Sequence, residues 1–207
     1  MSALSLSGIV EGQAEVRFGF LHSWHLFTPW GLVGFLLFLT AAAAEANRTP
    51  FDLPEAESEI IAGYFTEYSG FKFAIFFLAE YLGLFAMCGL GITLFLGGWL
   101  PPFKFLGFIP SWCWFLGKLI ALILLFIWLR GTLPRLRTDQ LMGFAWKFLL
   151  PMTLLNLLVA ALWHLLANSV PTLVRWPLCF ALLVVPYWLL GRSFESKVGK
   201  REYRFAN

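Results

Sequence analysis

The chain has 207 residues, of which 59% are hydrophobic and only 13% are charged, and its formal net charge is +3. Soluble domains carry about 25% charged residues, so this composition excludes an ordinary soluble globular protein. It indicates an all-α fold, namely a polytopic transmembrane helix bundle of about five spans. The three cysteines lie singly in separate apolar stretches, as small buried hydrophobic side chains do. We therefore expect no metal site in this chain.

Five apolar stretches are each long enough to cross a bilayer, which takes about 20 helical residues. We expect spans at about residues 27–46, 73–96, 111–129, 148–167 and 172–190, in a single integral membrane domain over residues 1–207. The fifth pattern is the weakest because it contains Arg175, Pro177 and Pro186, and a tilted or partly re-entrant helix would fit it. Residues 1–17 lack a signal-peptide pattern, so we expect the spans themselves to drive insertion.

The distribution of lysine and arginine predicts how the spans are oriented. Basic residues gather in three segments: Arg48 and Lys72 after the first span, Arg130, Arg135, Arg137 and Lys147 after the third, and Arg192, Lys197, Lys200, Arg201 and Arg204 in the tail. The other side carries Arg17, Lys104 and Arg175. Because positive charge is in excess in cytoplasmic loops, we expect the three basic segments to face the cytoplasm, or a mitochondrial matrix or plastid stroma.

Acidic residues concentrate in and around the predicted cytoplasmic loop at residues 47–72. Seven of the twelve acids lie here: Glu45, Asp52, Glu55, Glu57, Glu59, Glu67 and Glu80. Glu45 and Glu80 fall at the end of, or within, an apolar stretch, where a carboxylate costs about 2.5–3.5 kcal/mol. Such a group usually lines a wet cavity, a proton path or a ligand site. We therefore expect this face of the membrane to handle protons or a polar headgroup.

Glu45 directly follows four alanines, Ala41–Ala44. Small side chains allow a neighbouring helix to approach closely, so we expect Glu45 to point into a packed interface or a cavity. The alternative is an interfacial glutamate that reaches out to water at the helix end. Arg48 follows three residues later, a spacing that allows it to pair with Glu45.

Asp52, Pro54 and Glu55 predict the start of a short helix that runs to Ala62 and ends at Gly63. Acids in a first helical turn complement the helix dipole, which gives them a purely structural explanation. The i,i+4 spacing of two of them, Glu55 and Glu59, instead costs a few tenths of a kcal/mol. Clustered carboxylates titrate as a group, which favours a proton-loading site.

Three arginines, Arg130, Arg135 and Arg137, lie close together after the third span. They are suited to binding anionic lipid or to clamping carboxylates of a soluble partner. Both interpretations stay open on the residues alone.

Several stretches of the sequence, taken in order, resemble one known family. These are residues 5–13, 44–59, 63–70, 79–81 (Ala-Glu-Tyr), 96–99 (Leu-Gly-Gly-Trp), 130–142, 146–147 and 150–151. Over about residues 5–165 the sequence is similar to the family of quinone-site membrane subunits of respiratory complex I, the proton-pumping NADH:quinone oxidoreductase. The motifs are long, and they occur in the same order as in the family.

The resemblance implies a role for each group of charged residues. Glu45 and Glu80 would belong to an intramembrane proton path. Asp52, Glu55, Glu57, Glu59 and Glu67 would form an acidic funnel beside the quinone cavity. Arg48 and Phe51 would border that cavity, and Arg130, Arg135, Arg137 and Asp139 would dock hydrophilic subunits.

The resemblance also implies the surroundings of the chain. Quinone would be the substrate, no group would be covalently bound, and FMN and iron–sulfur clusters would lie only in partner subunits. The expected partners are the lipid bilayer, iron–sulfur and quinone-site hydrophilic subunits, and antiporter-like and small membrane subunits, with no nucleic acid. The expected location is an energy-converting membrane, specifically the bacterial inner membrane, which the chain would cross several times.

The sequence departs from the family at its start, because family members begin with about four further helices. We therefore expect a fragment, a late start or half of a split subunit, with no complete quinone site of its own. Three alternatives remain: a membrane anchor of a hydrogenase or of a dehydrogenase with another donor, a truncated non-functional remnant, and an independent secondary transporter. The transporter is disfavoured because the acidic pattern has no second copy, as an internal repeat would require.

Overall fold

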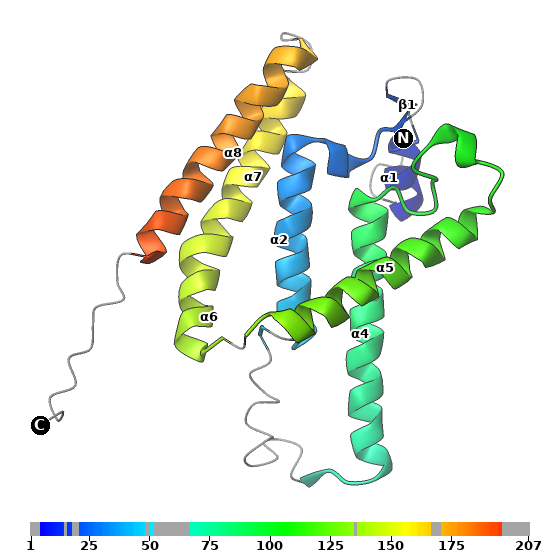
Figure 1. Cartoon of the computed structure of the whole chain (residues 1–207), viewed down its shortest axis with the longest axis vertical. Helices are drawn as coiled ribbons and strands as arrows, with labels where there is room; N and C mark the ends of the chain where they lie inside the picture. Colours follow the sequence, from blue (N-terminus) through cyan, green and yellow to red (C-terminus); the bar gives the residue numbers. More distant parts are fainter. Residues whose placement is uncertain are drawn as a thin grey trace, which may run out of the picture. The chain divides into compact units, whose positions relative to one another are not determined.

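The computed structural model describes residues 5–14, 16–17, 21–48, 50–51, 67–134, 136–166 and 171–195. Its chain forms two compact units, Met1–Met142 and Gly143–Asn207. The described residues are overwhelmingly helical, apart from one two-residue strand pair (Figure 1). The all-α, polytopic class predicted from composition is confirmed, because four described helices are long and apolar enough to cross a membrane and a fifth apolar helix is shorter.

Unit 1 begins with short elements that lead into its first long helix. They are α1 (Leu6–Gly12), β1 (Val16–Arg17) paired antiparallel with β2 (Leu21–His22), and the 3-10 helix η1 (His25–Phe27). The helix α2 (Pro29–Glu45) starts where the Thr28 hydroxyl accepts a hydrogen bond from the Gly31 amide at 3.1 Å. Pro29, the first residue of α2, has no backbone N–H group and so leaves no unpaired donor at the helix start. With 17 residues, α2 is at the lower limit for a span.

The other helices of unit 1 are α4 (Phe71–Phe95), η3 (Lys104–Leu106) and α5 (Ser111–Thr132). α4 packs on α2 through aromatic rings, with Phe35 and Phe38 lying 5.6 and 5.8 Å from Phe95 between ring centroids. Gly91 allows this approach, because a Cβ there would press on the Phe38 ring. The buried side of α4 also carries Cys88 and Ile92.

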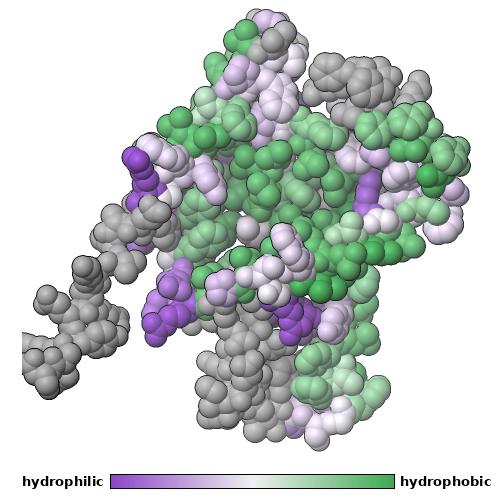
Figure 2. Space-filling model, in the orientation of Figure 1, coloured by the Kyte–Doolittle hydropathy of each residue, from purple (hydrophilic) through white to green (hydrophobic). Residues whose placement is uncertain are grey.

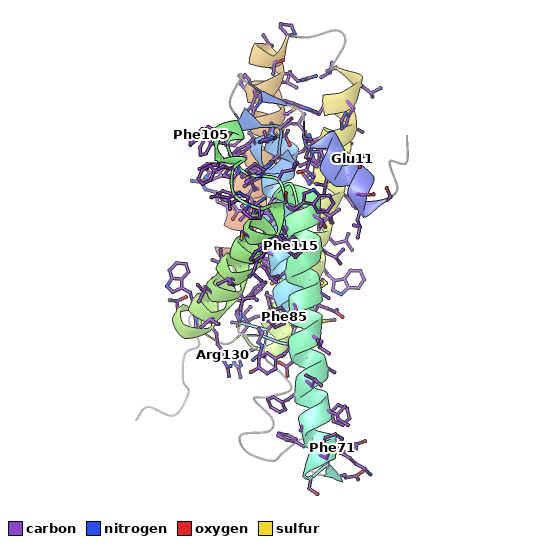
Figure 3. All side chains as sticks on the ribbon, turned by 90° about the vertical axis from the view of Figure 1, so that its right-hand side faces the viewer. Glu11, Phe71, Phe85, Phe105, Phe115 and Arg130 are labelled. Atoms are coloured by element: carbon purple, nitrogen blue, oxygen red, sulfur yellow. The ribbon has the colours of Figure 1, made fainter. Side chains whose placement is uncertain are left out.

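The first half of α4 has a different environment from the second. From Phe71 to Gly83 every side chain is at least partly exposed, and this end of the helix extends past the other ribbons of its unit (Figures 1 and 3). Apolar side chains make up most of the visible surfaces of α4 and α5 (Figure 2). Such surfaces suit lipid or neighbouring transmembrane helices rather than water.

The connection after α5 becomes helical earlier than the sequence predicted. α6 (Thr138–Phe144) continues through a π-helical turn, η4 (Ala145–Leu149), into α7 (Leu150–Leu165), whereas we expected the fourth span to begin near residue 148. The side chain of Gln140 accepts a hydrogen bond from the Arg137 amide at 3.2 Å and so caps the helix start. The π-turn lies just before Pro151, which cannot donate the regular backbone hydrogen bond.

Unit 2 is built on a helical pair, α7 and α8 (Thr172–Glu195). Met152, Val159 and Trp163 are buried on α7, and Cys179 and Leu183 are buried on α8. α8 stays helical through Pro177 and Pro186. The cationic group of Arg175 lies 4.0 Å from the centre of the Trp163 ring and donates to the Trp163 carbonyl at 3.3 Å. The arginine that weakened the fifth predicted span therefore contacts α7 through one hydrogen bond and one ring, although its buried Nε atom makes no hydrogen bond within the described residues.

Candidate functional site

The site begins at the C-terminal end of α2, where the chain turns back on itself. The Arg48 amide donates to the Ala43 carbonyl at 3.1 Å, and the Asn47 amide donates to the Ala44 carbonyl at 3.3 Å. Asn47 has a φ of 46°. This combination is a Schellman motif, in which asparagine is one of the few side chains that accept the left-handed position. The motif directs Arg48 inward instead of along the helix axis.

Arg48 and Glu80 form an ion pair between the α2 turn and the middle of α4. The Nη2 atom of Arg48 lies 3.2 Å from the Oε1 atom of Glu80, and the two side chains are 8% and 19% exposed. The guanidinium carbon also lies 4.7 Å from the centre of the Tyr81 ring. The sequence spacing allowed a pair between Arg48 and Glu45, but the ion pair joins Arg48 to Glu80 instead.

This pair places two opposite charges within an apolar helix layer. Glu80 is ten residues into α4 counting from Phe71, about 14 Å from its start at 1.5 Å per residue. A lone charge among apolar helices of a membrane protein is costly, and pairing reduces that cost. The buried Nη2 atom of Arg48 makes no hydrogen bond within the described residues, so the contact with Glu80 is ionic without hydrogen-bond geometry. The guanidinium is therefore held by charge and by the ring of Tyr81.

The residues after Arg48 join the pair to the arginine-containing loop. Phe51 is buried, with 6% of its surface exposed, and its amide donates to the Arg48 carbonyl at 2.8 Å. The Leu136 amide donates to the Pro50 carbonyl at 3.0 Å. This long-range bond places the loop between α5 and α6 beside the turn after α2. The common cytoplasmic face predicted for the two loops stays a prediction.

The other predicted site residues lie in varied positions. Glu45 is exposed at the last position of α2 and does not point into a packed interface among the described residues, so its position fits the alternative of a glutamate that reaches out at the helix end. Glu67 is exposed just before α4. Arg130, Arg137 and Asp139 lie around the α5–α6 loop; Arg130 is labelled in Figure 3 at the end of α5. Asp52, Glu55, Glu57, Glu59 and Arg135, and the short helix expected to end at Gly63, lie outside the described residues. The roles given to all these residues stay predictions.

Sequence reasoning missed two residues that build the site, Asn47 and Tyr81. Asn47 immediately follows the last turn of α2, a position where asparagine signals a left-handed cap. The ring of Tyr81 lies beside the guanidinium, which no pattern in the sequence predicted. No group of three or more His, Cys, Asp or Glu side chains that could hold a metal ion occurs within the described ranges.

Together, the apolar helices and the ion pair of buried Arg48 with half-buried Glu80 define a multi-pass α-helical membrane protein with a charged pair between two of its helices. A family model described as NADH dehydrogenase matches residues 1–161. The chain therefore belongs to this NADH dehydrogenase family.

Relatives in three bacteria are named as the H subunit of NADH-quinone oxidoreductase. The proteins of Bacillus cytotoxicus and Anoxybacillus flavithermus are each 54% identical to this chain over 160 residues, and that of Brevibacillus brevis is 51% identical over 159 residues. Each match covers 77% of this chain and 45% of the relative. The chain thus spans about half the length of the curated relatives it matches.

Proposed function

We propose that this chain supplies the quinone-site and proton-coupling part of a membrane-bound NADH-quinone oxidoreductase. The observation that carries the proposal is the ion pair of Arg48 and Glu80 inside an apolar helix layer. The name of the bacterial relatives supports it, since they match over most of the chain. The chain would conduct no electrons itself, and FMN and iron–sulfur clusters would belong to partner subunits.

The proposed coupling is electrostatic. The guanidinium of Arg48 faces the Glu80 carboxylate at 3.2 Å. Quinone reduction or movement near Phe51 would move the guanidinium relative to that carboxylate. The pair would thereby pass an event at the membrane face to the acids of the proton path, Glu80 and Glu45.

The remaining proposed residues act around this centre. Asp52, Glu55, Glu57, Glu59 and Glu67 would form the acidic funnel beside the quinone cavity. The loop bearing Arg130, Arg135, Arg137 and Asp139 would dock hydrophilic subunits, and the hydrogen bond from Leu136 to Pro50 connects it with the cavity border. Antiporter-like and small membrane subunits would continue the complex within the bilayer, and the location would be the bacterial inner membrane.

The proposal is tested by replacing Glu80 with glutamine in the native gene and assaying isolated membranes. We expect Glu80→Gln to lower NADH:quinone turnover and the proton pumping coupled to it. NADH oxidation by an artificial acceptor, which bypasses the quinone site, should stay intact. Glu80→Asp keeps the charge and should retain more coupled turnover than Glu80→Gln.

A matched control is Glu11→Gln, because Glu11 is an exposed carboxylate on α1 (Figure 3). It should leave both activities unchanged. Normal proton-pumped quinone reduction in Glu80→Gln would refute the proposed role. The partners are tested by purifying the chain from native membranes in mild detergent. Co-purification with iron–sulfur and antiporter-like subunits supports the proposal. Co-purification with hydrogenase subunits would assign the chain to a complex that uses another electron donor.

A further inference from the structure

A half-buried charge, Lys118 of α5, lies beside the opposite end of α4, and the proposed function does not use it. An α-helix leaves its last carbonyl groups without partners inside the helix, and in an apolar environment these groups must still be satisfied. At the end of α4, the Gln13 amide group donates to the carbonyls of Thr93 and Leu94 at 3.0 and 3.3 Å. Gln13 itself is fully buried.

Lys118 of α5 satisfies the carbonyls that follow. Its ammonium group donates to the carbonyls of Leu96, Gly98 and Leu100 at 2.6, 2.9 and 2.7 Å. The same nitrogen lies 4.1 Å from the centre of the Trp24 ring. Three carbonyls match the three N–H donors of an ammonium group, and the aromatic face covers it with favourable electrostatics.

We call the carbonyls of Leu96, Gly98 and Leu100, together with the Trp24 ring, the carbonyl cage. Residues other than Lys118 form this cage. Gly97 and Gly98 have φ values of 70° and 55°, which other residues adopt only with strain. A Cβ on Gly97 would overlap the Trp24 ring, and a Cβ on Gly98 would press on Val10. The two glycines therefore fix the carbonyls against Trp24 and α1, so the cage does not depend on α5 for its shape.

We propose that the carbonyl cage is a binding site for a small monovalent cation of the ammonium type, and that Lys118 is its tethered occupant. The helix dipole adds to the attraction, because cations are stabilised at a helix C-terminus. The acceptors of Lys118 are all backbone carbonyls, so no carboxylate in these contacts balances its charge. This inference is independent of the proposed electron-transport function.

The proposal predicts that a free ammonium ion can replace the side chain. The test uses the full chain in detergent, labelled with 5-fluorotryptophan, and the ¹⁹F resonance of Trp24 is assigned by its loss in Trp24→Phe. In Lys118→Ala this resonance should shift and the melting temperature should fall. Added methylammonium should restore both, with a saturable concentration dependence. Tetramethylammonium, which has the charge but no N–H donor, should restore neither.

Lys72→Ala is the matched control, since Lys72 is exposed in the first turn of α4. It should leave the Trp24 resonance in place and show no response to methylammonium. The proposal is overturned if Lys118→Ala keeps the wild-type resonance, if methylammonium has no effect, or if tetramethylammonium works equally well. If Lys118→Ala does not fold, it is prepared again with methylammonium present throughout, and failure to fold under that condition also overturns the proposal.

Discussion

Arg48, Lys118 and Arg175 each place a cation among apolar helices, and each meets different acceptors. Arg48 faces the carboxylate of Glu80. Lys118 contacts three backbone carbonyls, and Arg175 contacts the carbonyl and ring of Trp163. Of these three contacts, only that of Arg48 pairs the cation with a carboxylate. At the residue scale, this difference is the reason for testing the pair of Arg48 and Glu80 first.

The planar guanidinium of Arg48 leads to a testable distinction between charge and shape. Arg48→Lys keeps the positive charge but loses the broad contact with the Tyr81 ring. We expect it to retain partial NADH:quinone turnover, whereas Arg48→Ala should lose most of it and destabilise the protein by about 3 kcal/mol, because Glu80 is left unpaired. Turnover and melting temperature of both variants check this. Equal losses of turnover in Arg48→Lys and Arg48→Ala would show that the positive charge alone does not sustain turnover.

Gly97 gives a prediction about backbone geometry. Gly97→Ala should destabilise the protein by at least about 1–2 kcal/mol, the cost of a left-handed backbone for a residue with a Cβ, and overlap with Trp24 adds to it. Gly117→Ala is the matched control, because it lies within α5 with no atom within 4 Å of a new Cβ. Gly117→Ala should stabilise the protein by about 0.5–1 kcal/mol, because alanine is more favourable than glycine within a helix. Melting temperatures that fall equally in both variants would contradict this account.

At the scale of elements, the end of α2 decides where the site lies. The Schellman motif at Asn47 reverses the chain and brings Arg48 against α4. The π-turn before Pro151 has a different role, because it allows α6 and α7 to continue as one apolar helix. The Schellman motif and the π-turn are both local irregularities, and the side chains near them lie in positions that a regular helix would not give them.

The α2 turn is tested at Asn47. Asn47→Gly should keep stability and coupled turnover near wild type, since glycine adopts the same backbone. Asn47→Val should cost about 1–2 kcal/mol and should also lower NADH:quinone turnover by displacing Arg48. Both variants are compared by melting temperature and by turnover in membranes. If Asn47→Val is destabilised but keeps wild-type turnover, the geometry of the α2 turn is not needed for NADH:quinone turnover.

At the scale of the whole molecule, charge and hydropathy predict which ends of the helices share a membrane face. The hydrogen bond between Leu136 and Pro50 agrees with a common face for the first two basic loops. The two ends of α5 should therefore lie on opposite faces, its beginning outside and its end in the cytoplasm.

The two ends of α5 offer a matched pair for testing this orientation, because Ser111 and Thr132 are both exposed. In a background without the native cysteines, Ser111→Cys should react with a membrane-impermeant thiol reagent in intact cells. Thr132→Cys should react only after the membrane is permeabilised. Labelling is read by a mass shift of the purified chain. The reverse pattern would invert the predicted orientation.

The class of protein and the regions that matter could be predicted from the residues alone. Long apolar stretches must form helices in a membrane because no water is present to satisfy the backbone, so α4, α5 and the core of α7 were predictable. Acids placed in apolar stretches marked Glu80 as a candidate site residue, because the cost of such a charge is visible without a structure. The cap of α6 was missed because Gln140 accepts a local hydrogen bond from the Arg137 amide. A hydropathy pattern carries no information about such a contact.

Which charges meet depends on how the helices pack, and no sequence pattern showed it. Spacing allowed Arg48 to pair with Glu45, but the turn at Asn47 and the packing of α2 on α4 bring it to Glu80, 32 residues further along the chain. Lys118 likewise looks like an isolated charge in a span, and its carbonyl partners appear only when α5 crosses the end of α4. The physical reason is that ion pairs and carbonyl contacts act over a few ångströms, and helix packing sets distances on that scale.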